Sequence, residues 1–103
     1  MFKLVALFTH PADPAAFDAG FNRFLPLAEV LPGLRRVVVS HAHGGPEGAT
    51  PYYLMHELFF DDFTAARAAM ASPAGVAAAQ QLWTFAADNV TLFFADHLEE
   101  EKH

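Results

Sequence analysis

Hydrophobic residues occupy both faces of four segments that read as β-strands. The segments are residues 2–9, 34–42, 51–60 and 89–95. A sheet with one face in water alternates apolar and polar positions, because successive side chains point to opposite faces. These segments lack that alternation, so they predict four strands that are covered on both sides.

The third segment shows the pattern most clearly. Strict alternation divides its apolar residues into two sets, with Tyr53, Met55 and Phe59 on one face and Tyr52, Leu54, Leu58 and Phe60 on the other. Helices of the same chain can cover only one face. The other face then needs a partner sheet, and a second copy of the chain is the simplest source.

A first helix is predicted between the first two strands. Asp13 can cap it, and Pro14 suits its first turn. Its apolar stripe has spacings of four, three and four residues and consists of Phe17, Phe21, Phe24 and Ala28. Pro26 is expected to kink this helix or to end it near Leu25, because proline has no backbone N–H to donate.

Two more helices are predicted after the third strand. Asp61 or Asp62 is expected to cap a helix that reaches about residue 71, and Ser72 before Pro73 marks a new N-terminus. The last helix is expected over 73–87. Its inner face is predicted to hold Val76, Ala79, Trp83 and Ala86.

The order of these elements predicts the fold class. A β-α-β-β-α-β order is typical of an α+β, ferredoxin-like fold with a four-stranded antiparallel sheet in the spatial order 4-1-3-2. Both helical layers then lie on one face, and two sheets packed face to face give a dimeric α/β barrel. We expect one such domain over 1–97 and a frayed acidic tail over 98–103.

Composition supports an oligomer and excludes some partners. The 103 residues are 53% hydrophobic and only 17% charged, which favours a homodimer over a small monomer. The net charge of −6 argues against nucleic acid or an anionic membrane as partner. The chain has no cysteine, which is typical of a cytoplasmic protein. No segment approaches the roughly 20 apolar residues that span a bilayer.

Four blocks of sequence, together with a final VTLFFAD, extend over nearly the whole chain. They are KLVALF at 3–8, LPLAEVLPGLRR at 25–36, PYYLMHELFFDD at 51–62 and ASPAGVAAA at 71–79. In their order and spacing they resemble the EthD family of small dimeric α/β-barrel proteins. The resemblance implies a homodimer with a pocket between the sheet and the helices of each subunit.

The resemblance implies no single reaction, because related barrels include cofactor-free monooxygenases, haem-degrading enzymes, lactone isomerases and polyketide-tailoring enzymes. Many family members carry a histidine two residues before the proline of the first helix, where it suits proton transfer in the pocket. This chain has Phe24-Leu25-Pro26 there. A phenyl ring cannot transfer a proton, so either another group replaces the histidine or the pocket only binds.

Several candidate residues are expected at one edge of the sheet, namely His10, His41, His43, Tyr52 and Tyr53. Imidazole titrates near neutral pH, so such a cluster suits proton transfer or a transition metal. No carboxylate is obviously placed to complete a metal site, and His43 beside two glycines also suits a solvated loop. We therefore assign no metal and keep His10 and His41 as candidate catalytic residues.

His56 lies in mid strand, where its apolar neighbours predict burial. The loop length pairs it near Val37, which places it about 13 Å from His41, too far to share a metal. If His56 faces the helices, it lines the pocket and is a candidate replacement acid or base. If it faces the partner sheet, it is a hydrogen-bonded interface residue. Buried histidines are more often hydrogen-bonded than catalytic, and strand parity does not decide between the two faces.

Arg36 begins the second strand in a chain with only six lysine and arginine residues. It suits a clamp for a carboxylate or enolate, because guanidinium presents a fork of donors. The alternatives are a surface ion pair with Glu29 or a contact in the dimer.

Aromatic residues supply the remaining candidates for substrate binding. Tyr52 and Tyr53 straddle the sheet, so one is expected to line a cavity while the other packs. Phe21, Phe24 and Trp83 suit an aromatic ligand, although aromatic stripes at helical spacing usually form a core.

Two functions fit the sequence. The first is a small enzyme without a bound cofactor, of the oxidoreductase or polyketide-tailoring kind, which acts on an apolar or aromatic small molecule in the pocket. Oxygenation, dehydration and isomerisation are equally compatible with the residues. The second is a non-catalytic binding or carrier protein that keeps the barrel and has lost the helix-one histidine.

Overall fold

The structure, a computed structural model, describes residues 1–101. The elements in chain order are β1 (Phe2–Thr9), α1 (Pro14–Glu29), β2 (Arg36–His41), β3 (Tyr52–Phe60), α2 (Phe63–Ala71), α3 (Pro73–Ala86) and β4 (Val90–Asp96). The four strands form one antiparallel sheet in the order β2-β3-β1-β4. The ferredoxin-like topology expected from the sequence is therefore confirmed.

Helix starts follow the capping residues of the sequence. Asp13 accepts a hydrogen bond from the Ala16 N–H at 3.1 Å, and Asp62 accepts one from Ala65 at 2.8 Å. These side chains satisfy backbone donors that the first turn leaves without a partner. Ser72 caps α3 in the same way, which separates α2 from α3 as predicted.

Of the two alternatives for Pro26, a kink or an end of the helix near Leu25, the second is wrong. Helix α1 continues through Pro26 to Glu29, and Val30 forms its C-cap. Pro26 removes one backbone donor, but the turn that follows carries the fully buried Ala28. Burial of this last turn against the core outweighs the missing hydrogen bond.

The predicted inner face of α3 is confirmed at Ala86 and wrong at Val76 and Trp83. Val76 and Trp83 are 49% and 50% exposed, whereas the buried residues of the helix are Gly75, Ala78, Leu82 and Ala86. Small residues are needed there because the helices approach closely. A Cβ on Gly75 would clash with the backbone carbonyl oxygen of Ala69.

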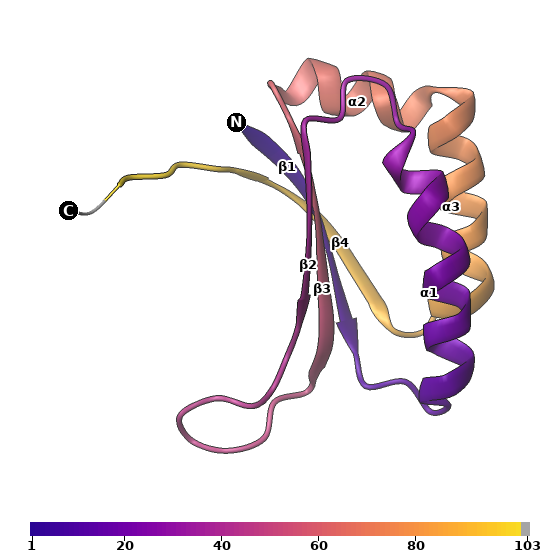
Figure 1. Ribbon diagram of the computed structural model, residues 1–103, viewed down its shortest axis with the longest axis vertical. Coiled ribbons are helices and arrows are strands. Elements are labelled where there is room, and N and C mark those ends of the chain that lie inside the picture. The colour runs from indigo at the N-terminus through magenta and orange to yellow at the C-terminus, as the bar shows by residue number, and fades with distance from the viewer. Residues whose placement is uncertain (102–103) are drawn as a thin grey trace.

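The elements form two layers, with all three helices on one face of the sheet (Figure 1). The main core lies between the layers and includes Phe8, Phe17 and Leu54. No helix within residues 1–101 has the length and hydropathy needed to cross a membrane.

The other face of the sheet, which we call the open face, has no helix over it. The chain after β4 and the loop between β2 and β3 both project from this side (Figure 1). Strand register places Val5, Val38, Met55, Phe59 and Phe93 on the open face. It is therefore largely apolar, as the sequence pattern indicated.

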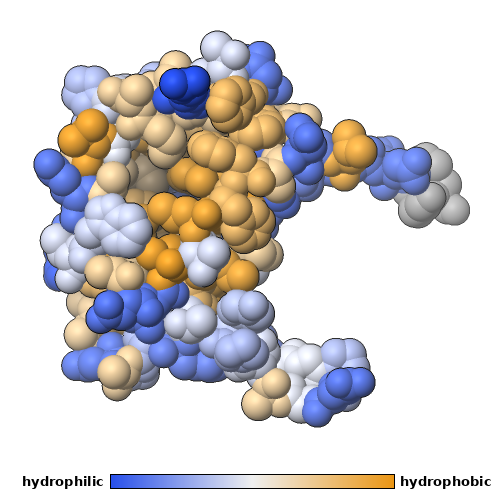
Figure 2. Space-filling model, turned by 180° about the vertical axis from the view of Figure 1, so that it is seen from behind, coloured by the Kyte–Doolittle hydropathy of each residue, from blue (hydrophilic) through white to orange (hydrophobic). Residues whose placement is uncertain are grey.

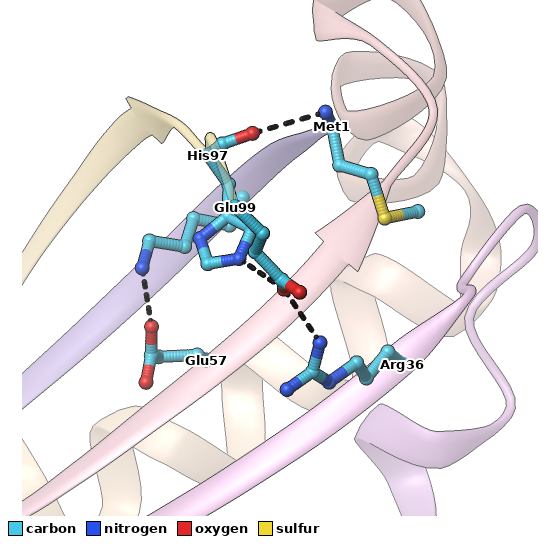
Figure 3. Close-up of polar contacts among 6 residues, drawn as sticks. Met1, Arg36, Glu57, His97 and Glu99 are labelled. Atoms are coloured by element: carbon cyan, nitrogen blue, oxygen red, sulfur yellow. Dashed lines mark hydrogen bonds and ion pairs between the residues drawn. The ribbon is translucent and has the colours of Figure 1, made fainter. Parts of the chain in front are cut away.

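Polar contacts tie the start of the C-terminal tail to one end of the open face (Figure 3). The His97 N–H donates to the carbonyl oxygen of Met1 at 2.8 Å, and its ring lies 4.7 Å from the ring of Phe59. Glu99 accepts a hydrogen bond from Arg36 at 2.9 Å. The fraying expected over 98–103 stays a prediction. Residues 102–103 of that expected tail lie outside the described residues.

Candidate functional site: an apolar pocket with one histidine

A cavity of about 70 Å³ lies between the sheet and the helices. Strands β1, β3 and β4 form one wall, and the three helices form the other. Its lining consists of Leu4, Ala6, Phe24, Ala28, Leu31, His56, Leu58, Met70, Gly75, Ala78, Ala79, Leu82 and Leu92. His56 is the single polar side chain in this set, so the pocket is apolar except for one imidazole ring.

The cavity reaches the surface beside β4 and α3. Leu92 of β4 is 40% exposed, and Ala79 of α3 is also exposed, although both line the cavity. Figure 2 shows broad hydrophobic surface on the back of the molecule, beside a depression. An apolar molecule can therefore enter without crossing a charged surface.

His56 faces the helices. It pairs with Ala6 of β1 and Val39 of β2 in the sheet, and only 1% of the residue is exposed. The rings of Phe21 and Phe24 on α1 each meet its imidazole edge-on, with centroids 5.5 Å apart. Its Nε2 is buried and has no hydrogen-bond partner among the described residues. Of the two faces that the sequence left open for His56, the structure shows the helical one.

Burial lowers the pKa of His56 from 6.5 to about 4, because the charged imidazolium loses its water. The neighbouring carboxylate of Glu57 acts in the opposite direction and is the smaller influence. The ring is therefore neutral near pH 7. A neutral ring can accept a proton or share a hydrogen bond, but it carries no charge to attract an anion.

The buried carboxylate of Glu57 faces away from the pocket. Adjacent strand residues point to opposite faces, so Glu57 lies on the open face, where it forms an ion pair with Lys3 at 2.5 Å. Figure 3 shows this pair beside the contacts of the C-terminal tail. Because Lys3 neutralises it locally, Glu57 is not placed to serve as an acid or base for the pocket.

The register of β2 against β3 differs from the expected one. His56 pairs with Val39 rather than Val37, and His41 pairs with Leu54. His41 is therefore two residues from His56 along the ladder and on the same face of the sheet. It is nevertheless exposed at the edge of the sheet, outside the lining of the pocket.

The two tyrosines exchange the faces that strict alternation assigned to them. The register between β1 and β3 shifts between Phe8 and Thr9, and this irregularity turns Tyr53 toward α1. The Tyr53 hydroxyl donates to Asp18 at 2.9 Å, and this acceptor raises the pKa of the hydroxyl. Tyr52 instead lines a hollow on the open side. Neither tyrosine lines the pocket.

The histidines at the loop end of the sheet do not reach the pocket either. His10 lies 2.9 Å from the carbonyl oxygen of Thr50 through its Nε2, and its ring is 5.8 Å from that of Tyr53. His43 lines a shallow hollow on the open side, and His41, at the end of β2, borders both that hollow and a second one beside α1. Among residues 1–101 there is no group of three or more histidine or carboxylate side chains placed to hold a metal ion.

Arg36 and Trp83 lie outside the pocket. Arg36 belongs to the open face, where it contacts Glu99 and lies 5.0 Å from the ring centroid of Phe59. Arg36 thus forms a surface ion pair with Glu99, and the alternative of a pair with Glu29 is not formed. Trp83 lies on the exposed side of α3. Of the substrate-binding candidates, Phe24 lines the pocket and Phe21 packs against His56.

The small residues that shape the pocket were not identified from the sequence. Ala6, Ala28 and Ala78 leave the cavity open because they do not fill the space between the layers. Met70 and Leu92 were missed as well. The available signal was the abundance of alanine and glycine in the last two helices, which indicates close packing without locating a cavity.

Comparison with known proteins agrees with this architecture. The model of the EthD domain matches residues 9–97. The chain belongs to the EthD family. A crystal structure of an EthD family protein from Bacillus halodurans C-125 is 36% identical, covers 95% of this chain and 99% of its own, and has a TM-score of 0.91.

Two further relatives extend the comparison. An uncharacterized 11.0 kDa protein of Rhodococcus erythropolis is 34% identical over an alignment of 100 residues, which covers 93% of this chain and 94% of that protein. SnoaB, a cofactor-independent oxygenase from Streptomyces nogalater, is 19% identical, with 96% of this chain and 94% of SnoaB covered and a TM-score of 0.71. The latter similarity shows the fold alone.

Replacing His56 by leucine should stabilise the protein. The His56→Leu variant fills a similar volume without burying an unpaired nitrogen, so we expect a gain of about 1–3 kcal/mol in unfolding free energy at pH 7.

Because the unfolded ring takes up a proton near pH 6.5 and the folded ring only near pH 4, the wild type loses stability as pH falls through this window. The gap between variant and wild type should widen by about 3 kcal/mol between pH 7 and pH 4.

Urea denaturation of both proteins across this pH range measures the gap. The exposed His43 provides the control, because His43→Leu should change stability by less than about 0.5 kcal/mol. A His56→Leu protein that is less stable than the wild type at every pH would contradict the unpaired, neutral state of His56.

Proposed function

We propose that this protein binds a small apolar molecule in the pocket and acts on it by proton transfer to or from His56, without a bound cofactor. The observation that carries the proposal is the buried, unpaired Nε2 of His56 in a pocket lined otherwise by hydrocarbon. An unpaired buried nitrogen costs stability, so its presence indicates a functional requirement.

Proton transfer at His56 requires no other polar group in the pocket. When neutral Nε2 accepts a proton, an N–H bond forms as an O–H or C–H bond of the ligand breaks, and the electron pair stays on the ligand. The product is an imidazolium beside a ligand anion, and their attraction is strong because water is excluded. Cofactor-free oxygenation by dioxygen, dehydration and isomerisation can all begin with such a step.

The phenyl ring of Phe24 cannot transfer a proton, so in this proposal the proton-transfer group lies on β3 instead of α1. The resemblance to EthD proteins places a histidine at position 24 in many members, and Phe24 lies against His56 in the same pocket. A histidine on α1 and a histidine on β3 would thus reach the same ligand from opposite walls. His56 takes over the role that Phe24 cannot perform.

A second candidate function is binding without turnover. No second polar side chain among the described residues lines the pocket, so no side-chain relay leads a proton from His56 to solvent. A ring with a pKa of about 4 is also a weak base at neutral pH. The two candidates differ in one observable, because an enzyme releases a compound of changed mass or structure and a carrier releases its ligand unchanged.

The same proposal includes a homodimer formed through the open face. Its apolar residues have no cover within the described chain, and the tail and the β2–β3 loop extend from its two ends (Figure 1). A second sheet packed on this face would bury those residues. A stable interface of this kind buries about 800 Å² on each partner.

The pocket should be the binding site for apolar probes. We expect benzene to bind the wild type and to shift the NMR signals of residues around the cavity, such as Ala6 and Leu92. Ala78→Leu places a larger side chain in the cavity and should abolish these shifts. Ala77 lies on the exposed side of the same helix, so Ala77→Leu should leave them intact.

The paired alanine variants separate pocket binding from nonspecific adsorption. Equal shifts in both alanine variants would mean that benzene binds elsewhere. Absence of shifts in the wild type would contradict a binding function for this pocket.

Charge on the open face should dissociate the dimer. Phe93 and Phe94 are adjacent on β4 and equally exposed, at 43%, but register places Phe93 on the open face and Phe94 on the helical side. Sedimentation equilibrium should therefore show a folded monomer for Phe93→Asp and a dimer for Phe94→Asp. A dimer in both variants, or a monomeric wild type, would refute the open-face interface.

A further inference from the structure

Resting on the proposed function, we propose that the ligand of this pocket is a compact, uncharged molecule with one hydroxyl group on an apolar body, and that the hydroxyl pairs with Nε2 of His56. Apart from His56, the side chains that line the pocket can offer a ligand only apolar contacts. The single imidazole therefore sets the chemistry of the polar group that the site accepts.

A hydroxyl group matches His56 in either tautomer. In a neutral imidazole, Nε2 is a donor in one tautomer and an acceptor in the other. A carbonyl or ether oxygen can only accept, so it pairs with one tautomer alone. A hydroxyl both donates and accepts, and it completes the hydrogen bond that Nε2 lacks whichever nitrogen holds the proton.

The surroundings of His56 require an uncharged ligand. The register neighbours of His56 are Ala6 of β1 and Val39 of β2, its ring meets Phe21 and Phe24 of α1, and none of these four residues is ionisable. Glu57 is adjacent on β3, but it is paired with Lys3 on the opposite face. No cation within residues 1–101 lines the cavity, so a carboxylate would lose its water without compensation.

The volume of the cavity limits the ligand to about one ring. An apolar cavity of about 150 Å³ is known to hold benzene, and this pocket has about 70 Å³. Met70 and Leu92 can adjust, because methionine is flexible and Leu92 borders solvent. A single ring fits if these side chains move or if part of it extends through the opening, whereas a fused polycyclic body does not.

Phenol and fluorobenzene provide a matched pair of probes. They share a ring and differ in whether the substituent can donate a hydrogen bond. We expect phenol to bind the wild type roughly 5- to 100-fold more tightly than fluorobenzene in NMR titrations at pH 7. In His56→Leu the two affinities should become nearly equal, because the hydroxyl then has no partner. Benzoate should bind more weakly than phenol.

The outcomes separate this inference from the proposed function. Equal binding of phenol and fluorobenzene by the wild type would overturn the hydroxyl preference while the pocket remains a binding site. A preference for phenol that persists in His56→Leu, or tighter binding of benzoate than of phenol, would also overturn the inference. Failure of both neutral probes to bind would remove the binding function itself, and with it the inference.

Discussion

Removal of the His56 imidazole from water is the constraint on which the site depends. The ring sits between two phenylalanines of α1 and the neighbouring strands, and this burial lowers its pKa to about 4. It also leaves Nε2 without a hydrogen-bond partner in the described part of the chain. The folded protein can bury a neutral imidazole with one unpaired nitrogen. It could not bury an imidazolium without a facing carboxylate, because the cost in stability would be too high. The same burial therefore sets both the chemistry of the pocket and its cost in stability.

The two faces of the sheet have different roles because the helices cover only one of them. Alternation along β3 places His56 in the pocket and Glu57 on the open face, where Lys3 pairs with it. Small residues on β1, α1 and α3 keep the cavity open. The open face remains apolar, and its tail and loop extend away from the helices, which fits a second copy of the chain. The pocket and the open face thus lie on opposite sides of the same sheet.

Hydrophobic periodicity and capping residues were sufficient to predict the sheet order and the starts of the helices. They failed where tertiary packing overrides local pattern. The inner face of α3 was misplaced because close approach at Gly75 selects the small residues, and helix α1 continues past Pro26 because Ala28 is buried. The tyrosines exchanged faces through an irregular register that no residue pattern marks. For His56, burial was predictable, but its face was not, because strand parity alone does not show which side the helices cover.

The most direct test follows the His56 ring itself. Nitrogen-15 NMR of labelled imidazole across pH 3 to 8 reports both the tautomer and the protonation state. The ring should stay neutral down to about pH 4, and in ligand-free protein Nε2 should show no hydrogen-bond partner. Protonation near the ordinary value of 6.5 would mean that water or a polar group reaches the ring, and the apolar, single-histidine pocket would be refuted.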